Sequence, residues 1–267
     1  PFYPSMNDLI TSTSNPKVKE IVQLLTKARA RKQSGLCVIE GAREIQRALA
    51  AGWEGMELWS KEDAAQAQWM QLFERQYIAG AKVFEKIAYR SGTEAHVALF
   101  KQRQWKLDEL GALLSEARGV LVVEGIEKPG NAGAILRTAQ AAGVAAVFFA
   151  DAALDLYGPN VMRNATGAIF EVPTVLGTSQ QVQMLLDEYD FHVYITHMHT
   201  DSVSMFQLDW PGKSAIVLGE ESGGLSSHWL HQGYTNTIIP MEGEVVDSLN
   251  VSVAAAVLMY HWKSKLV

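Results

Sequence analysis

Three short segments in the second half of the chain combine glycine, polar and charged residues in patterns that suit a ligand site. The first, residues 127–139, reads EKPGNAGAILRTA and places Arg137 six residues after Asn131. Asn131 is a good candidate for the N-cap of a helix that this segment opens. Arg137 stands among apolar neighbours, and burying an unpaired guanidinium is costly. We therefore expect Arg137 to meet either a ligand anion such as a phosphate or a neighbouring carboxylate.

The second segment, residues 218–225, reads LGEESGGL. Its glycines permit unusual backbone angles and a close approach of the backbone to a ligand. It matches neither the dinucleotide-binding pattern nor the P-loop. Two carboxylates in one loop would repel a phosphate, but they suit a cationic or polyhydroxyl ligand. A plain turn from a strand into a helix is the alternative interpretation.

The third segment, residues 238–254, reads IIPMEGEVVDSLNVSVA. A strand that ends in Pro-Met is followed by a loop and then by Ser248, Leu249 and Asn250 before the last helix. Either Ser248 or Asn250 is a candidate N-cap for that helix.

Buried strands must position these segments, because each segment follows a short apolar run. The runs at 120–123, 146–150, 191–196, 216–218 and 237–239 are typical of strands covered on both faces, which predicts a parallel sheet in an α/β fold. Ligands of such sheets bind at the carboxyl ends of the strands. A helix is expected from about Asn131 to Ala142, ended by Gly143. The last helix, 250–265, is apolar on nearly every face at 253–259, so it must be buried in the core or against a second subunit.

The first half of the chain predicts a smaller α/β unit. We expect helices at 17–32 and 43–51 and strands at 36–39, 55–59 and 95–100. A polar, helix-prone stretch follows, which gives domains at 1–106 and 119–267 joined by a linker at 107–118.

Charge is divided unevenly between the two halves. The net charge is −6, but residues 1–106 hold 16 Lys and Arg against 11 Asp and Glu, a net of +5, which leaves −11 for the rest. The densest basic stretch contains Lys17, Lys19, Lys27, Arg29, Arg31 and Lys32. This stretch is either an ordinary solvated helix face or a surface for a polyanion. The single cysteine, Cys37, and the absence of a long apolar run predict a cytoplasmic protein without internal disulfides or membrane spans.

Taken together and in this order, the three segments resemble the motifs of the SpoU/TrmH branch of the SPOUT RNA 2′-O-ribose methyltransferases. The first motif has Asn and Arg six residues apart, as Asn131 and Arg137 are; the second is G-x-E-x-x-G, met by Gly219, Glu221 and Gly224; the third is I-P-M-x-G followed by S-L-N-V, met by 239–243 and 248–251. Residues 36–50 resemble the start of the family's substrate-binding domain, which is similar to a small ribosomal protein. The chain departs from the family by one extra residue between Gly243 and Ser248 and by Ala165 in place of a serine.

The resemblance implies a C-terminal domain with a deep trefoil knot, a homodimer, and methylation of a ribose 2′-hydroxyl in structured RNA, with ribosomal RNA favoured over transfer RNA. It implies S-adenosyl-L-methionine as the methyl donor, held around Leu218, Gly219, Ile239, Met241 and Leu249. The implied catalytic set is Asn131, Arg137, Glu221, Ser248 and Asn250. Because a guanidinium has a pKa above ~12, we expect Arg137 to orient and stabilise the acceptor rather than to act as a base.

Two other functional classes are alternatives. A Rossmann-like oxidoreductase is disfavoured because no G-x-G-x-x-G pattern is present. A non-catalytic RNA-binding protein with a degenerate knot is disfavoured because Asn131, Arg137, Ser248 and Asn250 are intact. No metal is expected, because His197 and His199 have no cluster of carboxylates and histidines beside them.

Overall fold

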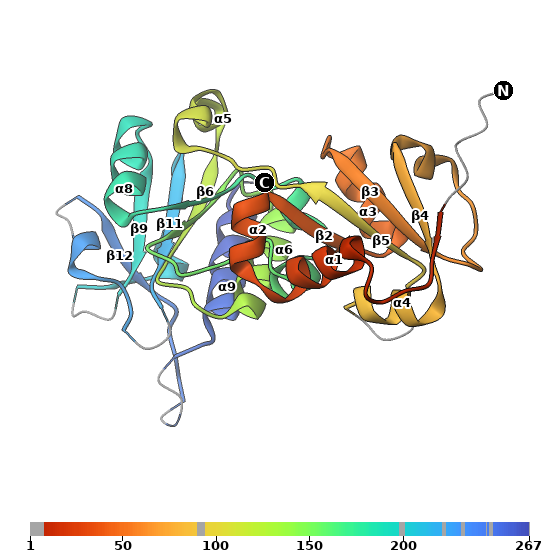
Figure 1. The fold of residues 1–267 in the computed structure, drawn as a ribbon. Helices are drawn as coiled ribbons and strands as arrows, with labels where there is room; N and C mark the ends of the chain where they lie inside the picture. Colours follow the sequence, from red (N-terminus) through yellow and green to blue (C-terminus); the bar gives the residue numbers. More distant parts are fainter. Residues whose placement is uncertain are drawn as a thin grey trace. The chain divides into compact units, whose positions relative to one another are not determined.

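The computed structural model describes residues 8–89, 94–197, 201–220, 223–230, 233–243, 245 and 248–266. These residues form two compact units (Figure 1), one of Pro1–Arg103 with Asp155–Arg163 and one of Gln104–Leu154 with Asn164–Val267. The segment Asp155–Arg163 thus belongs with the first unit, although it lies in the second half of the chain. It includes most of helix α7 (Pro159–Ala165). The domain boundaries at 106 and 118 stay a prediction.

The first unit is built on a mixed five-stranded sheet. Its strand order is β1 (Asp8–Ile10), β4 (Arg75–Ala79), β3 (Gly55–Lys61), β5 (His96–Lys101) and β2 (Leu36–Glu40). β1, β4 and β3 are parallel, whereas β5 runs antiparallel to both of its neighbours. The helices of this unit are α1 (Pro16–Thr26), α2 (Ala28–Ser34), α3 (Ala42–Ala50) and α4 (Ala81–Ile87). The unit is therefore the small α/β domain that the sequence predicts.

The single helix predicted at 17–32 is wrong, because the chain forms two helices separated by an extended Lys27. α1 begins at Pro16 and is capped by Asn15, whose side chain accepts the Lys17 backbone N–H at 2.9 Å. The break removes the helical partner of the Leu24 carbonyl. The Arg31 guanidinium donates to that carbonyl instead, and it also donates through Nε to Asp155 Oδ2 at 2.8 Å. Arg31 is 6% exposed, whereas the Asp155 side chain is 31% exposed, so a buried guanidinium meets a partly exposed carboxylate at the edge of the first unit.

The second unit is built on a seven-stranded sheet in which every pair of neighbouring strands is parallel. The strand order is β10 (Val203–Ser204), β12 (Thr235–Ile238), β9 (His192–Thr196), β11 (Ser214–Leu218), β6 (Gly119–Glu124), β7 (Val147–Ala150) and β8 (Thr174–Gly177). The predicted parallel sheet is confirmed.

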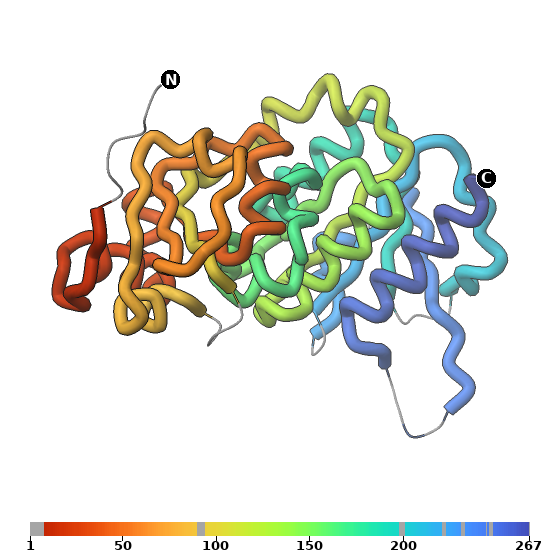
Figure 2. The backbone as a smooth tube through the Cα atoms, turned by 90° about the vertical axis from the view of Figure 1, so that its right-hand side faces the viewer, coloured from red at the N-terminus to blue at the C-terminus, as the bar shows by residue number. Residues whose placement is uncertain are grey.

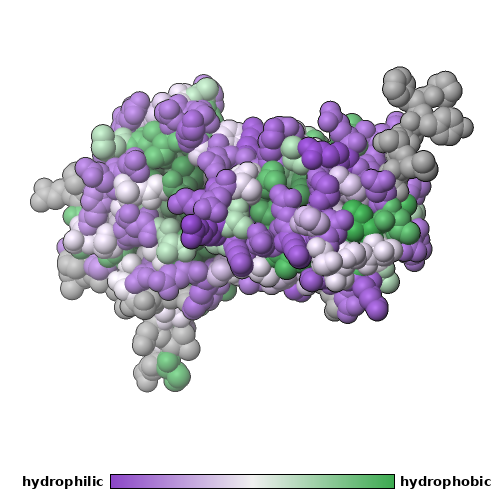
Figure 3. All heavy atoms as spheres, viewed as in Figure 1, coloured by the Kyte–Doolittle hydropathy of each residue, from purple (hydrophilic) through white to green (hydrophobic). Residues whose placement is uncertain are grey.

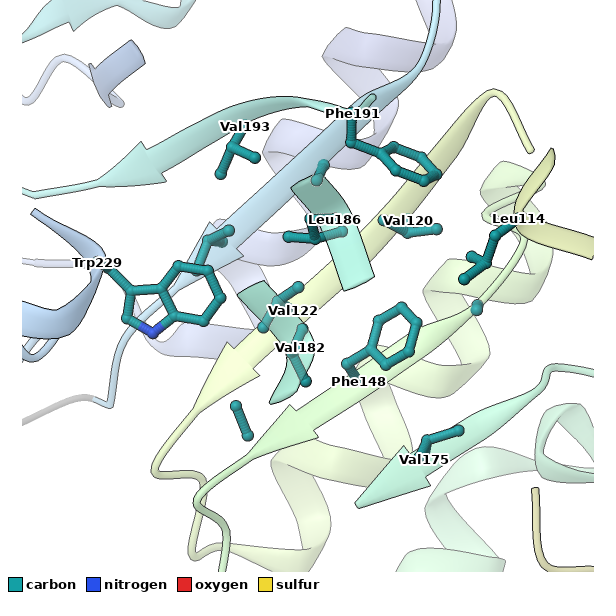
Figure 4. Close-up of a cluster of buried hydrophobic side chains, with 14 of the residues drawn as sticks. Leu114, Val120, Val122, Phe148, Val175, Val182, Leu186, Phe191, Val193 and Trp229 are labelled. Carbon is teal, nitrogen blue, oxygen red and sulfur yellow. The ribbon is translucent and has the colours of Figure 1, made fainter. Parts of the chain in front are cut away.

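Both faces of this sheet are covered, which is why its central strands β11, β6 and β7 are buried at every position and mostly apolar. On one face Val120, Val122 and Phe148 pack with Val182 and Leu186 of α8 (Ser179–Glu188), as Figure 4 shows. The short helix α5 (Gly111–Glu116) adds Leu114 to the same cluster. The long helices α6 (Pro129–Ala142) and α9 (Val251–Ser264) pack against each other, and Figure 2 shows them side by side. No helix in the described part of the chain is long and apolar enough to cross a membrane.

The order of the strands creates a switch point in the middle of the sheet. From β6 the chain builds outward through β7 and β8, and it then returns to the other side, where β11 lies between β6 and β9. The connections after β6 and β11 therefore leave in opposite directions along the sheet. Ligands of open α/β sheets bind in the crevice at the carboxyl ends of two such strands.

Candidate active site

A pocket of about 250 Å³ lies at this switch point. It is bordered by the residues that follow β6 and β11 and by the beginnings of α6 and α9. The lining residues are Val123, Gly125, Ile126, Glu127, Lys128, Asn131, Glu220 and Val251. The pocket thus brings together parts of all three sequence segments.

A side-chain hydrogen bond joins the first segment to the third. Asn250 Nδ2 donates to Asn131 Oδ1 at 3.3 Å. Asn250 is also the N-cap of α9, since its Oδ1 accepts the Ser252 backbone N–H at 2.9 Å. Asn131 is not a cap, because α6 begins at Pro129 and Lys128 occupies the N-cap position. Asn131 lines the pocket, and its Oδ1 accepts the hydrogen bond from Asn250.

Arg137 lies two turns further along α6, and its side chain is exposed. Arg137 is therefore not buried by the chain itself, and its expected meeting with a ligand anion stays a prediction. The reason for its exposure is the direction of the helix faces: Ala132, Ile135, Leu136 and Ala139 point into the core, and position 137 falls on the opposite side. Among the described residues Arg137 has no salt-bridge partner. Its charge is available to a ligand or to another subunit.

The second segment forms a tightly folded loop after β11. A Cβ atom added at Gly219 would lie 2.0 Å from the backbone carbon of Gly224, so no other residue fits there without moving the main chain. Gly224 has a φ of +67°, and its N–H donates to the Glu220 carbonyl at 3.1 Å. The glycines of the motif are thus required by close approach at Gly219 and by a left-handed turn at Gly224. Glu221, like His199, lies outside the described residues.

The five predicted donor-binding residues stand at the carboxyl ends of β11 and β12 or just before α9. Leu218 is buried, Ile239 and Leu249 are half-buried, and Met241 is 42% exposed. Ser248 is exposed. None of these residues lines the 250 Å³ pocket, in contrast to Asn131. Their role in holding the donor stays a prediction.

Gly125 and Ile126 of the pocket lie outside the three sequence segments, and Glu127, Lys128 and Glu220 lie within them but were not predicted as site residues. Glu127 and Lys128 directly precede α6, and Glu220 belongs to the second segment, residues 218–225, which we call the glycine loop. A charged pair immediately before a helix that follows a buried strand was the signal available for the first two, since this position faces the ligand crevice in α/β sheets.

The basic stretch of the first unit is only partly available to a partner. Lys17 Nζ forms a salt bridge with Glu57 Oε1 at 2.8 Å, and the buried Arg31 forms one with Asp155. Lys19, Lys27, Arg29 and Lys32 are exposed and have no acidic partner in the described part of the chain. The face on which α1 and α2 are seen in Figure 1 is mainly hydrophilic, with smaller apolar areas between (Figure 3).

The fold and the pocket define a two-domain α/β protein whose all-parallel domain has a pocket at its switch point, beside a glycine loop. The profile of the SpoU rRNA Methylase family matches residues 118–260, and that of the MRM3-like substrate binding domain matches residues 15–98. The chain therefore belongs to the SpoU rRNA methylase family, which confirms the resemblance and the predicted α/β fold class, whereas the trefoil knot stays a prediction.

Individual relatives agree over nearly the whole chain. The 23S rRNA (guanosine(2553)-2'-O)-methyltransferase RlmP of Bacillus subtilis is 27% identical over 94% of this chain and 98% of its own length. The crystal structure of an RNA 2'-O ribose methyltransferase superposes with a TM-score of 0.81 and 34% identity, over 97% of this chain and 99% of the other. An AdoMet-bound rRNA methyltransferase from Sinorhizobium meliloti has the same fold, with a TM-score of 0.88 and 23% identity over 98% of this chain and 100% of the other.

Proposed function

We propose that this protein transfers the methyl group of S-adenosyl-L-methionine to a ribose 2′-hydroxyl of ribosomal RNA. Membership of the SpoU rRNA methylase family supports the reaction. The relative from Bacillus subtilis, which modifies 23S rRNA, supports ribosomal RNA over transfer RNA. The observation that carries the proposal in this chain is the hydrogen bond between Asn131 and Asn250 beside the switch-point pocket, because it joins the first and third motifs at one place. The cytoplasm remains the proposed compartment.

The donor is proposed to lie against the glycine loop and the segments that follow β12. When bound, the donor supplies an electrophilic methyl group on a sulfonium. Gly219 lets the loop return closely against the end of β11, and Ile239, Met241 and Leu249 offer apolar surface that the chain itself does not fully bury. Apolar walls with a few backbone hydrogen bonds suit an adenine ring. These residues therefore fit the donor, in a knotted chain path like that of the family.

Arg137 is proposed to act on the acceptor RNA. Its exposed guanidinium is suited to a phosphate and to the 2′-hydroxyl, and positioning that hydroxyl in line with the methyl group supplies much of the acceleration. Asn131, Ser248 and Asn250 would orient the nucleotide or the loops by hydrogen bonds. Glu221 is assigned to support of the loop or of the neighbouring subunit.

A second copy of the chain is the proposed partner of α9. The helix buries Val251, Ala255, Leu258, Met259 and Trp262, but it leaves Val253 47% and Tyr260 50% exposed. Phe206, 64% exposed, lies beside this helix with its ring 5.7 Å from that of His261. An apolar surface of this kind on a helix marks an interface. Light scattering at micromolar concentration is expected to give twice the mass of one chain, and a monomer would contradict the assignment.

The reaction is tested with purified protein, donor carrying a labelled methyl group, and unmodified 23S rRNA transcript. We expect label in the RNA at one or a few nucleotides that become resistant to alkaline cleavage, as a 2′-O-methyl group requires. An otherwise identical reaction with transfer RNA serves as the control for substrate class. Label that appears on a base, or only in transfer RNA, would contradict the proposal.

A further inference from the structure

A buried carboxylate stands at the carboxyl end of β6, beside the pocket. Glu124 is 6% exposed, and its chain neighbours Val123 and Gly125 both line the pocket. We propose that Glu124 is a positioning residue that holds the glycine loop in its donor-binding shape. The inference rests on the proposed function, since it assumes that this loop binds the donor.

The contacts of Glu124 reach two different elements. Ser226, just after the glycine loop, donates its backbone N–H to Oε2 and its hydroxyl to Oε1, each at 2.7 Å. Ser179, the first residue of α8, donates its hydroxyl to the same Oε1, also at 2.7 Å. All three residues belong to the second unit.

The donors explain how a carboxylate is tolerated in the interior. A buried charge is costly unless hydrogen bonds or an opposite charge compensate it, and no described cation forms a salt bridge with Glu124. An ionised carboxylate only accepts hydrogen bonds, so it matches three donors. A glutamine of the same shape would either turn its N–H₂ group toward the Ser226 N–H and lose that bond, or turn it toward the two hydroxyls, which would then have to accept. In both cases the hydrogen bonds lose the strengthening that a full charge gives them.

The hydrogen bonds between Ser226 and Glu124 fix the end of the glycine loop. Ser226 follows Gly224 by two residues, and Gly224 is the residue against which Gly219 packs without room for a Cβ. Fixing Ser226 therefore fixes the return of the loop against the end of β11. Ser179 anchors the same oxygen but lies outside the loop.

These two serines provide a matched pair for an experiment on the full-length protein. Ser226→Ala and Ser179→Ala each remove one hydroxyl donor from Glu124 Oε1. Ser226→Thr keeps the hydroxyl, and Ser226 is exposed enough to accept a methyl group. Glu124→Gln is the fourth variant. Calorimetry with S-adenosyl-L-methionine measures the Kd, and thermal unfolding measures the stability of each variant.

We expect Ser226→Ala to raise the Kd about fivefold to tenfold, the scale of one lost hydrogen bond. Glu124→Gln should raise the Kd more, whereas Ser179→Ala should leave it within about twofold despite a similar fall in Tm. Ser226→Thr should bind almost as the unaltered protein does. Equal effects of the two alanine variants on the Kd, or an unchanged Kd in folded Glu124→Gln, would overturn the inference. Loss of donor binding by the unaltered protein would instead overturn the proposed function and this inference with it.

Discussion

Replacing Gly219 by alanine should disable the glycine loop, which we propose binds the donor, while leaving the rest of the fold intact. The added Cβ would lie 2.0 Å from the backbone carbon of Gly224 and 2.2 Å from its carbonyl oxygen, and real Cβ contacts are essentially never below 3.0 Å. The main chain on one side of the loop must therefore move by about 1 Å, a displacement that typically costs ~10² in rate when it affects a reacting group. Such overpacking also destabilises by ~1–3 kcal/mol.

Gly223 in the same loop provides the matched control. A Cβ at Gly223 would approach only the carboxylate oxygen of Glu220, at 2.5 Å, and this side chain can rotate away. Methyl incorporation into RNA and calorimetry with the donor are measured for both variants. We expect Gly219→Ala to lose about 10² in methylation rate and to bind the donor weakly, with Gly223→Ala reduced only a few fold. Normal donor affinity in folded Gly219→Ala would refute the placement of the donor at this loop.

Three further predictions concern the first unit. The double variant Arg29→Glu, Lys32→Glu should weaken RNA binding, because two exposed, unpaired cations are lost. The slope of the logarithm of the association constant against the logarithm of the salt concentration should become shallower by about 1.4 to 1.8. An unchanged slope in filter binding would show that Arg29 and Lys32 lie outside the RNA-binding surface. Burial raises the pKa of the Cys37 thiol to about 12, so iodoacetamide at pH 8 should label it only after unfolding, which mass spectrometry detects; rapid labelling of the folded protein would contradict its burial. Burial lowers the pKa of His96, so below about pH 6.5 the unfolded chain takes up a proton that the folded chain does not. The Tm should therefore decrease as the pH is lowered through this range, and it should decrease less in His96→Gln. Parallel plots of Tm against pH for the two proteins would contradict this linkage.

The features of the second unit that could be predicted from sequence are those set by local chemistry. Strands buried on both faces contain short, nearly continuous apolar runs, and these runs predicted β6, β7, β9 and β11. Gly143, with a φ of +81°, ends α6 as expected, and Asn250 caps α9. The spacing of Asn131, Arg137 and the two later motifs identified the family, because three patterns in one order are specific.

The features that could not be predicted depend on contacts distant in sequence. The break between α1 and α2 is stabilised by Arg31, whose charge is compensated by Asp155, and no local signal links these positions. The exposure of Arg137 depends on which face α6 turns to the core, and a shift of the helix start from Asn131 to Pro129 removes the expected cap. The role of Glu124 could not be predicted from sequence, because its partners Ser179 and Ser226 are 55 and 102 residues away.

The separation of donor binding from methyl transfer in Arg137→Ala tests the central claim most directly. If the exposed guanidinium acts on the acceptor RNA, its loss should leave the donor Kd and the Tm nearly unchanged and lower single-turnover methylation by ~10² or more. Arg137→Lys should be almost as inactive, because a lysine cannot present a planar pair of donors. Full activity of Arg137→Ala, or loss of donor binding in proportion to the rate, would contradict the account.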